Sequence, residues 1–272
     1  MLRVNHQPKF SKVEHGARPG PASSYEMRQW EKVAIAELFL TEEAGAERLQ
    51  TFTDLMCNGM DVDTQCSGLD MLRHSLTNFF HSMQMHGMHS PSVRWLAATD
   101  KDTQVQNVLV ELAKAEDGKS SCVFQDVLDC VDPDYLSLLK SMMPHSSCNA
   151  SEKAAANKQI IDICIADCSL VFPASRQADC LVHGRECPVN AAFDPKSDAL
   201  KVNVTSTPCV AWSRAGKREG CCSQTELVHH AWLGQRAQKA SSGIEHLYFH
   251  ENVLWGRCGH CEKCVFRFSF NV

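Results

Sequence analysis

Residues 93–124 read VRWLAATDKDTQVQNVLVELAKAEDGKSSCVF, and this stretch decides the fold class. The apolar run at 93–98 predicts a short buried strand. Apolar residues then recur at helical spacing over 102–114, and 121–124 predicts a second short strand. A strand, a helix and another strand in this order form the unit from which parallel sheets are built.

The same alternation continues toward the C-terminus. The hydrophobic pattern predicts a helix over 135–143, a strand over 200–204, a helix over 225–239 and a strand over 246–249. Residues 61–64 form a weaker strand candidate, because only half of them are apolar. We therefore expect an α/β, Rossmann-like domain with a largely parallel sheet.

Composition shifts divide the chain into segments. Residues 1–24 are rich in proline, glycine and basic side chains and predict a flexible leader, followed by a helical N-terminal extension at 25–60. We expect the main domain to occupy 61–255, with an insertion at about 144–197 that carries four prolines and an alanine-rich helical stretch. A cysteine-rich tail follows at 256–272.

Charge and cysteine content restrict the function classes. The net charge is −5 and the pI about 6.2, so contact with nucleic acid would need a local basic patch. The N-terminus lacks the apolar core of a signal peptide, and no run reaches the roughly 18 apolar residues of a membrane span. Fifteen cysteines, an odd count without a signal, favour reduced thiols and an intracellular location.

A small-residue turn and two acidic residues predict a cofactor site. The string Cys66-Ser67-Gly68-Leu69-Asp70 precedes a helical pattern, while Asp100 and Asp126 each follow a predicted strand. Ligands of parallel sheets bind beyond the carboxyl ends of the strands, where glycine admits the ligand and an acid accepts hydrogen bonds from ribose. The alternative is a solvated turn with two unrelated strand-end acids.

A thiol and a carboxylic acid predict covalent catalysis. Residues 207–213 read TPCVAWS, and Glu251-Asn252-Val253 begins 42 residues after Cys209. A cysteine thiolate can add to an electron-poor ring, and a positioned carboxylic acid can supply a proton or a strong hydrogen bond to it. The alternative is one buried thiol among fifteen and a surface acid.

These strings resemble motifs of the cytosine-C5 DNA methyltransferases. The resemblance implies an S-adenosylmethionine-dependent methyltransferase fold and methylation of cytosine carbon 5 through a covalent cysteine. Cys209 would be the nucleophile and Glu251 the acid that orients the cytosine. Pro208 and Ser213 would shape the nucleophile's loop, and Asn252 would fix the backbone beside Glu251. The implied S-adenosylmethionine site comprises Cys66, Ser67, Gly68, Asp70, Asp100 for the ribose and Asp126 for the adenine.

The resemblance covers roughly 61–255, and the family's later recognition motifs are not visible. We therefore expect an incomplete, N-terminal catalytic half of the fold, either active or degenerate. DNA is the favoured partner, which would imply the nucleus in a eukaryote. RNA cytosine is the alternative, because some relatives of this family act on transfer RNA. The sequence predicts no membrane partner and does not define the oligomeric state.

Two groups of cysteines support a rival interpretation. One is Cys258, Cys261 and Cys264, and the other is Cys180, His183 and Cys187. Structural zinc needs four tetrahedral ligands, and neither group supplies a closed set alone, so we assign no metal ligand. The rival is a non-catalytic, zinc-stabilised protein that binds a partner.

Overall fold

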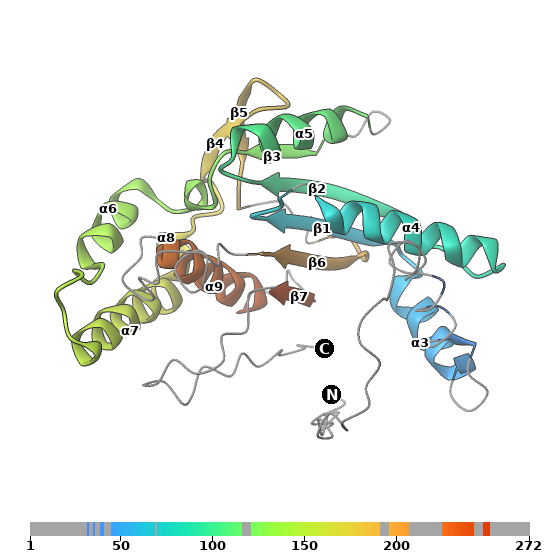
Figure 1. Ribbon diagram of the computed structural model, residues 1–272, viewed down its shortest axis with the longest axis horizontal. Coiled ribbons are helices and arrows are strands. Elements are labelled where there is room, and N and C mark those ends of the chain that lie inside the picture. The colour runs from blue at the N-terminus through green and yellow to red at the C-terminus, as the bar shows by residue number, and fades with distance from the viewer. Residues whose placement is uncertain are drawn as a thin grey trace.

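The computed structural model of the 272-residue chain describes residues 32, 35, 39–40, 45–68, 70–115, 121–190, 196–206, 225–241 and 247–250. Within these ranges a five-stranded parallel sheet has the order β3-β2-β1-β6-β7 (Figure 1). The elements, in chain order, are α3 (Gly45–Met56), β1 (Met60–Gln65), α4 (Met71–Met85), β2 (Val93–Thr99), α5 (Thr103–Lys114), β3 (Cys122–Phe124), the 3-10 helix η1 (Val127–Cys130), α6 (Pro133–Met142), α7 (Ala150–Ala166), α8 (Cys168–Val171), β4 (Gln177–Cys180), β5 (Arg185–Pro188), β6 (Leu200–Thr205), α9 (Thr225–Ser241) and β7 (Leu247–His250).

The strand order reverses direction between β1 and β6. From β1 the chain moves outward through α4 to β2 and through α5 to β3, and it later returns to place β6 on the other side of β1. Such a reversal is where open α/β sheets bind ligands, beyond the carboxyl ends of the strands. The predicted α/β class with a largely parallel sheet is confirmed, and the arrangement is consistent with a Rossmann-like fold.

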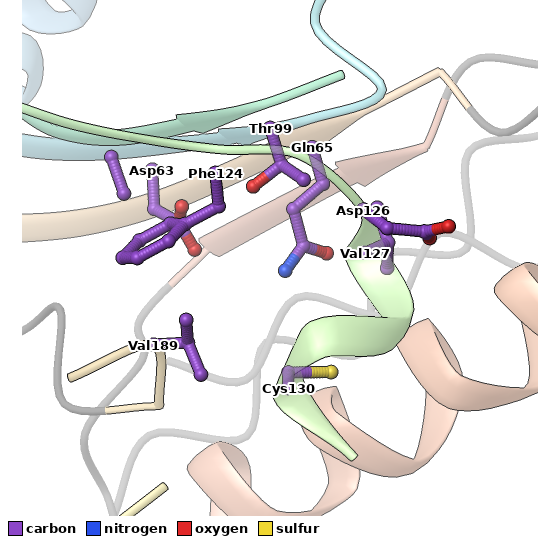
Figure 2. A pocket seen from close by; sticks show the side chains of 9 residues that line it. Asp63, Gln65, Thr99, Phe124, Asp126, Val127, Cys130 and Val189 are labelled. Atoms are coloured by element: carbon purple, nitrogen blue, oxygen red, sulfur yellow. The ribbon is translucent and has the colours of Figure 1, made fainter. Parts of the chain in front are cut away.

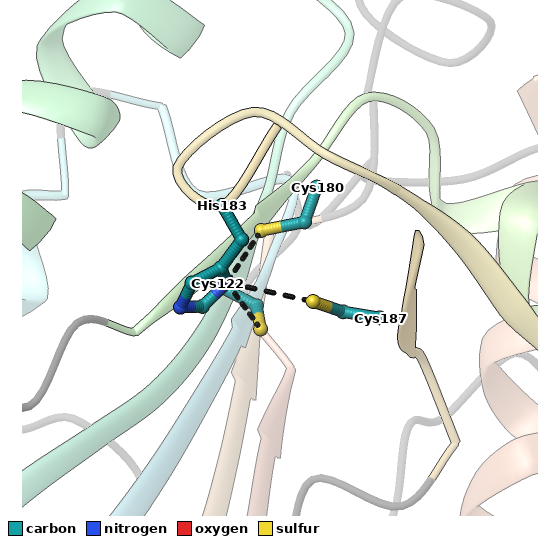
Figure 3. Close-up of side chains that lie close together, drawn as sticks. All are labelled: Cys122, Cys180, His183 and Cys187. Atoms are coloured by element: carbon teal, nitrogen blue, oxygen red, sulfur yellow. Dashed lines mark hydrogen bonds between the residues drawn. The ribbon is translucent and has the colours of Figure 1, made fainter. Parts of the chain in front are cut away.

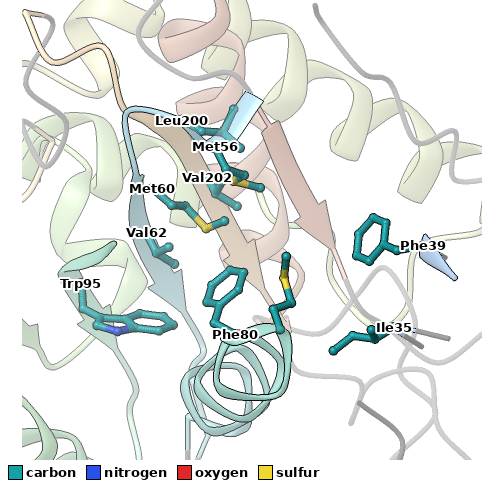
Figure 4. Close-up of a cluster of buried hydrophobic side chains, with 10 residues drawn as sticks. Ile35, Phe39, Met56, Met60, Val62, Phe80, Trp95, Leu200 and Val202 are labelled. Carbon is teal, nitrogen blue, oxygen red and sulfur yellow. The ribbon is translucent and has the colours of Figure 1, made fainter. Parts of the chain in front are cut away.

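An apolar cluster packs α4 against one face of the sheet. Figure 4 shows Met60 and Val62 of β1, Trp95 of β2 and Phe80 of α4 in this cluster. Leu200 and Val202 of β6 complete its strand side, and Ile35, Phe39 and Met56 also belong to it. Next to it, Leu109 and Ala113 of α5 pack on Ala98 and Val123. Burial of these side chains, at about 25 cal/mol per Å² of apolar surface, is the main stabilising contribution.

The opposite face of β1 is polar and lies toward α9. Asp61 receives two hydrogen bonds from Arg94, at 2.8 and 2.6 Å, and Asp63 lies 3.6 Å from the buried Lys239 ammonium of α9. All six residues of β1 are buried. The half-apolar sequence at 61–64 therefore belongs to a central strand whose carboxylates are paired with cations.

The other predicted elements agree with the structure within one or two residues. The helices predicted at 102–114, 135–143 and 225–239 correspond to α5, α6 and α9, and the four remaining predicted strands correspond to β2, β3, β6 and β7. Asp102 caps α5 by accepting hydrogen bonds from the backbone N–H groups of Gln104 and Val105, at 2.8 and 3.2 Å.

Residues 144–190 form two structural units outside the parallel sheet, a helical one and a β-hairpin. The predicted helical stretch is α7, which begins with a capping box between Asn149 and Glu152 and packs against α9. After the short α8, β4 and β5 form an antiparallel hairpin that lies beside β3 (Figure 1). This hairpin therefore approaches the otherwise open edge of the parallel sheet.

Candidate functional site

The turn after β1 is fastened to the end of β2. The backbone N–H of Ser67 donates to the Thr99 carbonyl at 3.0 Å, and the Ser67 hydroxyl lies 2.8 Å from that of Thr64. The Thr99 N–H also donates to the Ser67 hydroxyl at 3.3 Å. These bonds fix the backbone of the predicted cofactor turn at the carboxyl edge of the sheet, beside the switch point.

Three residues of this turn have left-handed backbone conformations. The φ angles are 51° at Cys66, 54° at Gly68 and 52° at Asp70. This region is unfavourable for residues other than glycine, asparagine and aspartate, so Cys66 is the strained member. Strain that surrounding bonds maintain is concentrated at ligand sites in proteins, which makes this turn a candidate ligand site.

Asp100 braces the turn from the next strand. One carboxylate oxygen accepts the Gly68 N–H at 2.8 Å, and the other accepts the Asp102 N–H at 3.0 Å. A carboxylate offers about four lone-pair positions, so each oxygen retains the capacity to accept a further hydrogen bond. The predicted ribose-binding acid is thus in contact with the predicted cofactor turn.

Asp126 lies at the carboxyl end of β3 and caps η1. Its side chain accepts the Leu128 N–H at 3.0 Å, and its own N–H donates to Asp129 at the same distance. The Lys101 ammonium, on a side chain that is 86% exposed, is 3.4 Å from the other Asp126 oxygen. The capping explains the position of Asp126 without a ligand.

Asp70, predicted to belong to the cofactor site, is buried beside the turn. Its buried carboxylate accepts a hydrogen bond from Arg73 Nε at 2.7 Å, and the Arg73 guanidinium lies 4.7 Å from the centre of the Trp95 ring. This contact ties the first turn of α4 to β2. Asp70 therefore positions the turn from inside the fold.

Burial, together with acidic neighbours, keeps the Cys66 thiol protonated. Burial, followed by the negative charges of Asp100 and Asp126, raises the pKa of Cys66 to about 12, and a hydrogen bond with Thr205 opposes this. A thiol with this pKa is a poor nucleophile. The two carboxylates also make the edge favourable for a cationic, hydroxyl-bearing ligand and unfavourable for a diphosphate.

A small hollow opens beneath the strand ends, toward η1 (Figure 2). Its free volume is about 10 Å³, which is room for about one water molecule. Its lining includes Gln65, whose amide group donates to Gln235 at 2.7 Å while its buried Oε1 atom has no hydrogen-bond partner within the described residues. The lining residues are Asp63, Gln65, Ala97, Thr99, Phe124, Asp126, Val127, Cys130 and Val189.

The predicted catalytic residues follow two neighbouring strands. Pro208, Cys209, Ser213, Glu251 and Asn252 lie outside the described residues. β6 ends at Thr205 and β7 at His250, and these two residues are partners in the parallel pairing. The Ser206 N–H donates to the Gln65 carbonyl at 3.2 Å, so the chain leaves β6 beside the cofactor turn. Both strands therefore end at the same edge as the turn, and the predicted catalytic strings follow them in the sequence.

Four side chains of types that can ligate a metal ion meet at the other end of β3. Figure 3 shows Cys122 of β3 with Cys180, His183 and Cys187 of the β4–β5 hairpin. Their ligand atoms all lie within 4.8 Å of one another. The hydrogen bond with Cys122 and backbone N–H groups, including that of His183, lower the pKa of Cys180 to about 4. The sequence indicated three of these residues as a group but gave no signal for Cys122.

The other cysteines of the described ranges are free thiols. Burial raises the pKa values of Cys130 and Cys164 to about 12, as expected for thiols that act as small apolar side chains. The tail group of Cys258, Cys261 and Cys264 lies outside the described residues.

Comparisons of the chain with protein-family models, curated proteins and solved structures gave no match. Among the helices that the structure describes, we find none with the length and apolarity needed to cross a bilayer.

Proposed function

We propose that this chain is an S-adenosylmethionine-dependent methyltransferase of the cytosine-C5 class, with DNA as its substrate. The observation that carries the proposal is the convergence of four strand ends at one edge. β1 and β2 contribute the Ser67–Gly68 turn and Asp100, while β6 and β7 end three residues before Pro208 and directly before Glu251. The order of these parts along the chain agrees with the resemblance of the motifs.

The acceptor groups and the charge of this edge suit S-adenosylmethionine. The lone pairs left on Asp100 can accept hydrogen bonds from ribose hydroxyls, and a Cβ added at Gly68 would meet nothing within 4 Å, so the turn is open on that side. The negative charges of Asp100 and Asp126 favour a cationic cofactor. When bound, S-adenosylmethionine supplies a methyl group on an electrophilic sulfonium.

The residues that follow β6 and β7 would perform the covalent steps. The Cys209 thiolate adds to carbon 6 of cytosine, while Glu251 donates a proton or a strong hydrogen bond at ring nitrogen 3. The electron pair then resides at carbon 5, which becomes nucleophilic and accepts the methyl group. Loss of the carbon 5 proton to a base expels the Cys209 thiolate and restores the aromatic ring. The target base must leave the duplex for these steps, because carbon 6 is inaccessible in the stack.

The proposal is tested by methyl transfer from radiolabelled S-adenosylmethionine to cytosine-containing DNA. We expect incorporation by the full chain, loss of about 10²-fold or more in Cys209→Ser, and a marked decrease in Glu251→Gln. The matched control is Cys57→Ser, which changes an exposed free thiol on the described surface.

The nucleic acid that accepts the methyl group distinguishes this proposal from its alternatives. Transfer to cytosine in RNA and not in DNA would keep the chemistry and overturn the DNA assignment. If neither acceptor is labelled and S-adenosylmethionine does not bind, the chain is not a methyltransferase, and a non-catalytic binding role becomes the better explanation.

A further inference from the structure

We propose that Cys122, Cys180, His183 and Cys187 bind one structural zinc ion, which fastens the β4–β5 hairpin to the edge strand β3. The inference is independent of the proposed methyltransferase activity, because it depends only on this cluster and its position in the fold.

The hairpin presents three of the four ligands on one side. Side chains alternate along a strand, and Ala178 is paired with Cys187 across the hairpin, so Cys180 and Cys187 lie on the same, buried face. His183 lies in the turn that joins the strands, where Gly184 has a φ of 61°. Cys122 is the first residue of β3 and lies 61 positions before His183 in the sequence.

The distances match a tetrahedral ion. His183 Nδ1 lies 3.6 Å from Cys122 Sγ, 3.2 Å from Cys180 Sγ and 3.4 Å from Cys187 Sγ. With Zn–S bonds of about 2.3 Å and a Zn–N bond of about 2.0–2.1 Å, a tetrahedron places the nitrogen about 3.6 Å from each sulfur. The side chains are thus spaced around a point that an ion of this size would occupy.

Hydrogen bonding alone does not account for this arrangement. A ring nitrogen has either one N–H or one lone pair, so His183 Nδ1 can form at most one good hydrogen bond with three surrounding sulfurs. A cation at the centre would instead bind all four atoms at once. Three thiolates with one imidazole are soft ligands that select zinc over magnesium or calcium. Four protein ligands fill the tetrahedron, which is typical of a structural site.

The ion would reinforce an existing contact. The hairpin joins β3 through a backbone hydrogen bond, from the Leu181 N–H to the Val123 carbonyl at 2.9 Å, and through two apolar clusters, one with Ala178 and Phe124 and one in which Leu181 and Val182 pack on Val123. β3 has only three residues and lies at the edge of the sheet. Coordinate bonds to zinc would therefore link segments that are distant in sequence. They would hold the hairpin over this edge of the sheet.

The segments that zinc would join also contribute residues to the hollow at the carboxyl edge. Phe124 belongs to the cluster beneath the hairpin and lines the hollow, and Val189, which follows β5, lines it as well. Zinc would thus hold two walls of the hollow in place without taking part in chemistry there.

The test is metal analysis combined with X-ray absorption on the full chain that carries Cys258→Ser, Cys261→Ser and Cys264→Ser. These substitutions remove the tail thiols as competing ligands. We expect one zinc per chain after purification and a first shell of three sulfurs and one nitrogen, with Zn–S distances of about 2.3 Å. Absence of zinc, or a shell made of oxygen and nitrogen alone, would overturn the proposal.

Single substitutions then locate the ion. In the same background, Cys187→Ser should decrease the zinc content at least tenfold after dialysis against a chelator, whereas Cys148→Ser, which changes a partly exposed free thiol, should retain it. Tetrahedral cobalt absorption gives a second readout, because Co²⁺ added to the metal-free chain reports thiolate ligands directly. Full zinc retention in Cys187→Ser, with unchanged cobalt absorption, would contradict the assignment.

Discussion

The contrast between Asp100→Ala and Asp102→Ala tests the cofactor site most sharply. Asp100 braces Gly68 and has acceptor capacity toward the edge, whereas Asp102, two residues later, caps α5. Both substitutions remove one carboxylate that accepts backbone hydrogen bonds. The two variants are therefore matched in charge and in side-chain size, and they differ in whether the carboxylate contacts the cofactor turn.

The expected magnitudes follow from these contacts. Loss of a capping carboxylate costs about 0.5–2 kcal/mol of stability, and we expect a similar decrease for both variants, because each loses two hydrogen bonds from backbone N–H groups. For binding, a hydrogen bond from a ribose hydroxyl to a carboxylate contributes about 1.5–3 kcal/mol. Asp100→Ala should therefore weaken S-adenosylmethionine binding by about 10- to 150-fold for each such bond.

Isothermal titration calorimetry with S-adenosylmethionine measures the affinity, and urea unfolding measures the stability. Asp102→Ala should bind within about twofold of the unsubstituted chain once unfolded protein is accounted for. Equal affinities for the two variants, or unchanged binding by Asp100→Ala, would refute the assignment of Asp100 to the ribose.

Three further predictions concern stability. In Gly234→Ala, the new Cβ would lie 2.6 Å from Cys164 Cβ and 2.7 Å from Phe172 Cε2; overpacking should outweigh the gain in helix propensity, and urea unfolding should show a net loss of about 1–2 kcal/mol. Burial lowers the pKa of His230 to about 4, so the unfolded chain binds more protons than the folded one below the ordinary pKa of 6.5. Stability should therefore decrease by on the order of 3 kcal/mol as the pH falls from 6.5 to 4, and His230→Gln, which can still donate to Asn157, should flatten this dependence in urea titrations; an unchanged slope would contradict the assignment. Removal of zinc with a chelator should lower the free energy of unfolding by about 3 kcal/mol or more, and re-addition of zinc should restore it; insensitivity to the chelator in a protein that has lost its metal would contradict a stabilising role.

Local patterns predicted most of the secondary structure because these elements bury one apolar face or stripe. The stretch at 102–114 is an example, since its helical spacing and its Asp102 cap are both local. β1 was harder to predict because Asp61 and Asp63 look like surface residues until Arg94 and Lys239 are placed beside them. The pairing partners are distant in sequence, so no local pattern reports them.

In the candidate sites too, some features could be predicted from the sequence, and others depend on residues that are distant in sequence. The cofactor turn and Asp100 follow predicted strands, so parallel topology alone indicated that they would meet. Asp70 was predicted as a cofactor-site residue, and its ion pair with the buried Arg73 could not be predicted from the sequence alone. The fourth residue of the proposed zinc site, Cys122, could not be recognised, because it meets the hairpin only once β3 lies at the sheet edge. The roles of Cys209 and Glu251 stay predictions, since both lie outside the described residues.

The most direct test of the central claim is covalent trapping on DNA that contains 5-fluorocytosine, with S-adenosylmethionine present. After methyl transfer, carbon 5 carries fluorine and no proton, so elimination cannot release the attached cysteine. We predict an adduct that survives denaturation in the unsubstituted chain and in Cys57→Ser, and that is missing in Cys209→Ser. An adduct that persists in Cys209→Ser, or its absence with all three proteins although they are folded and bind S-adenosylmethionine, would contradict the proposed covalent methylation of DNA.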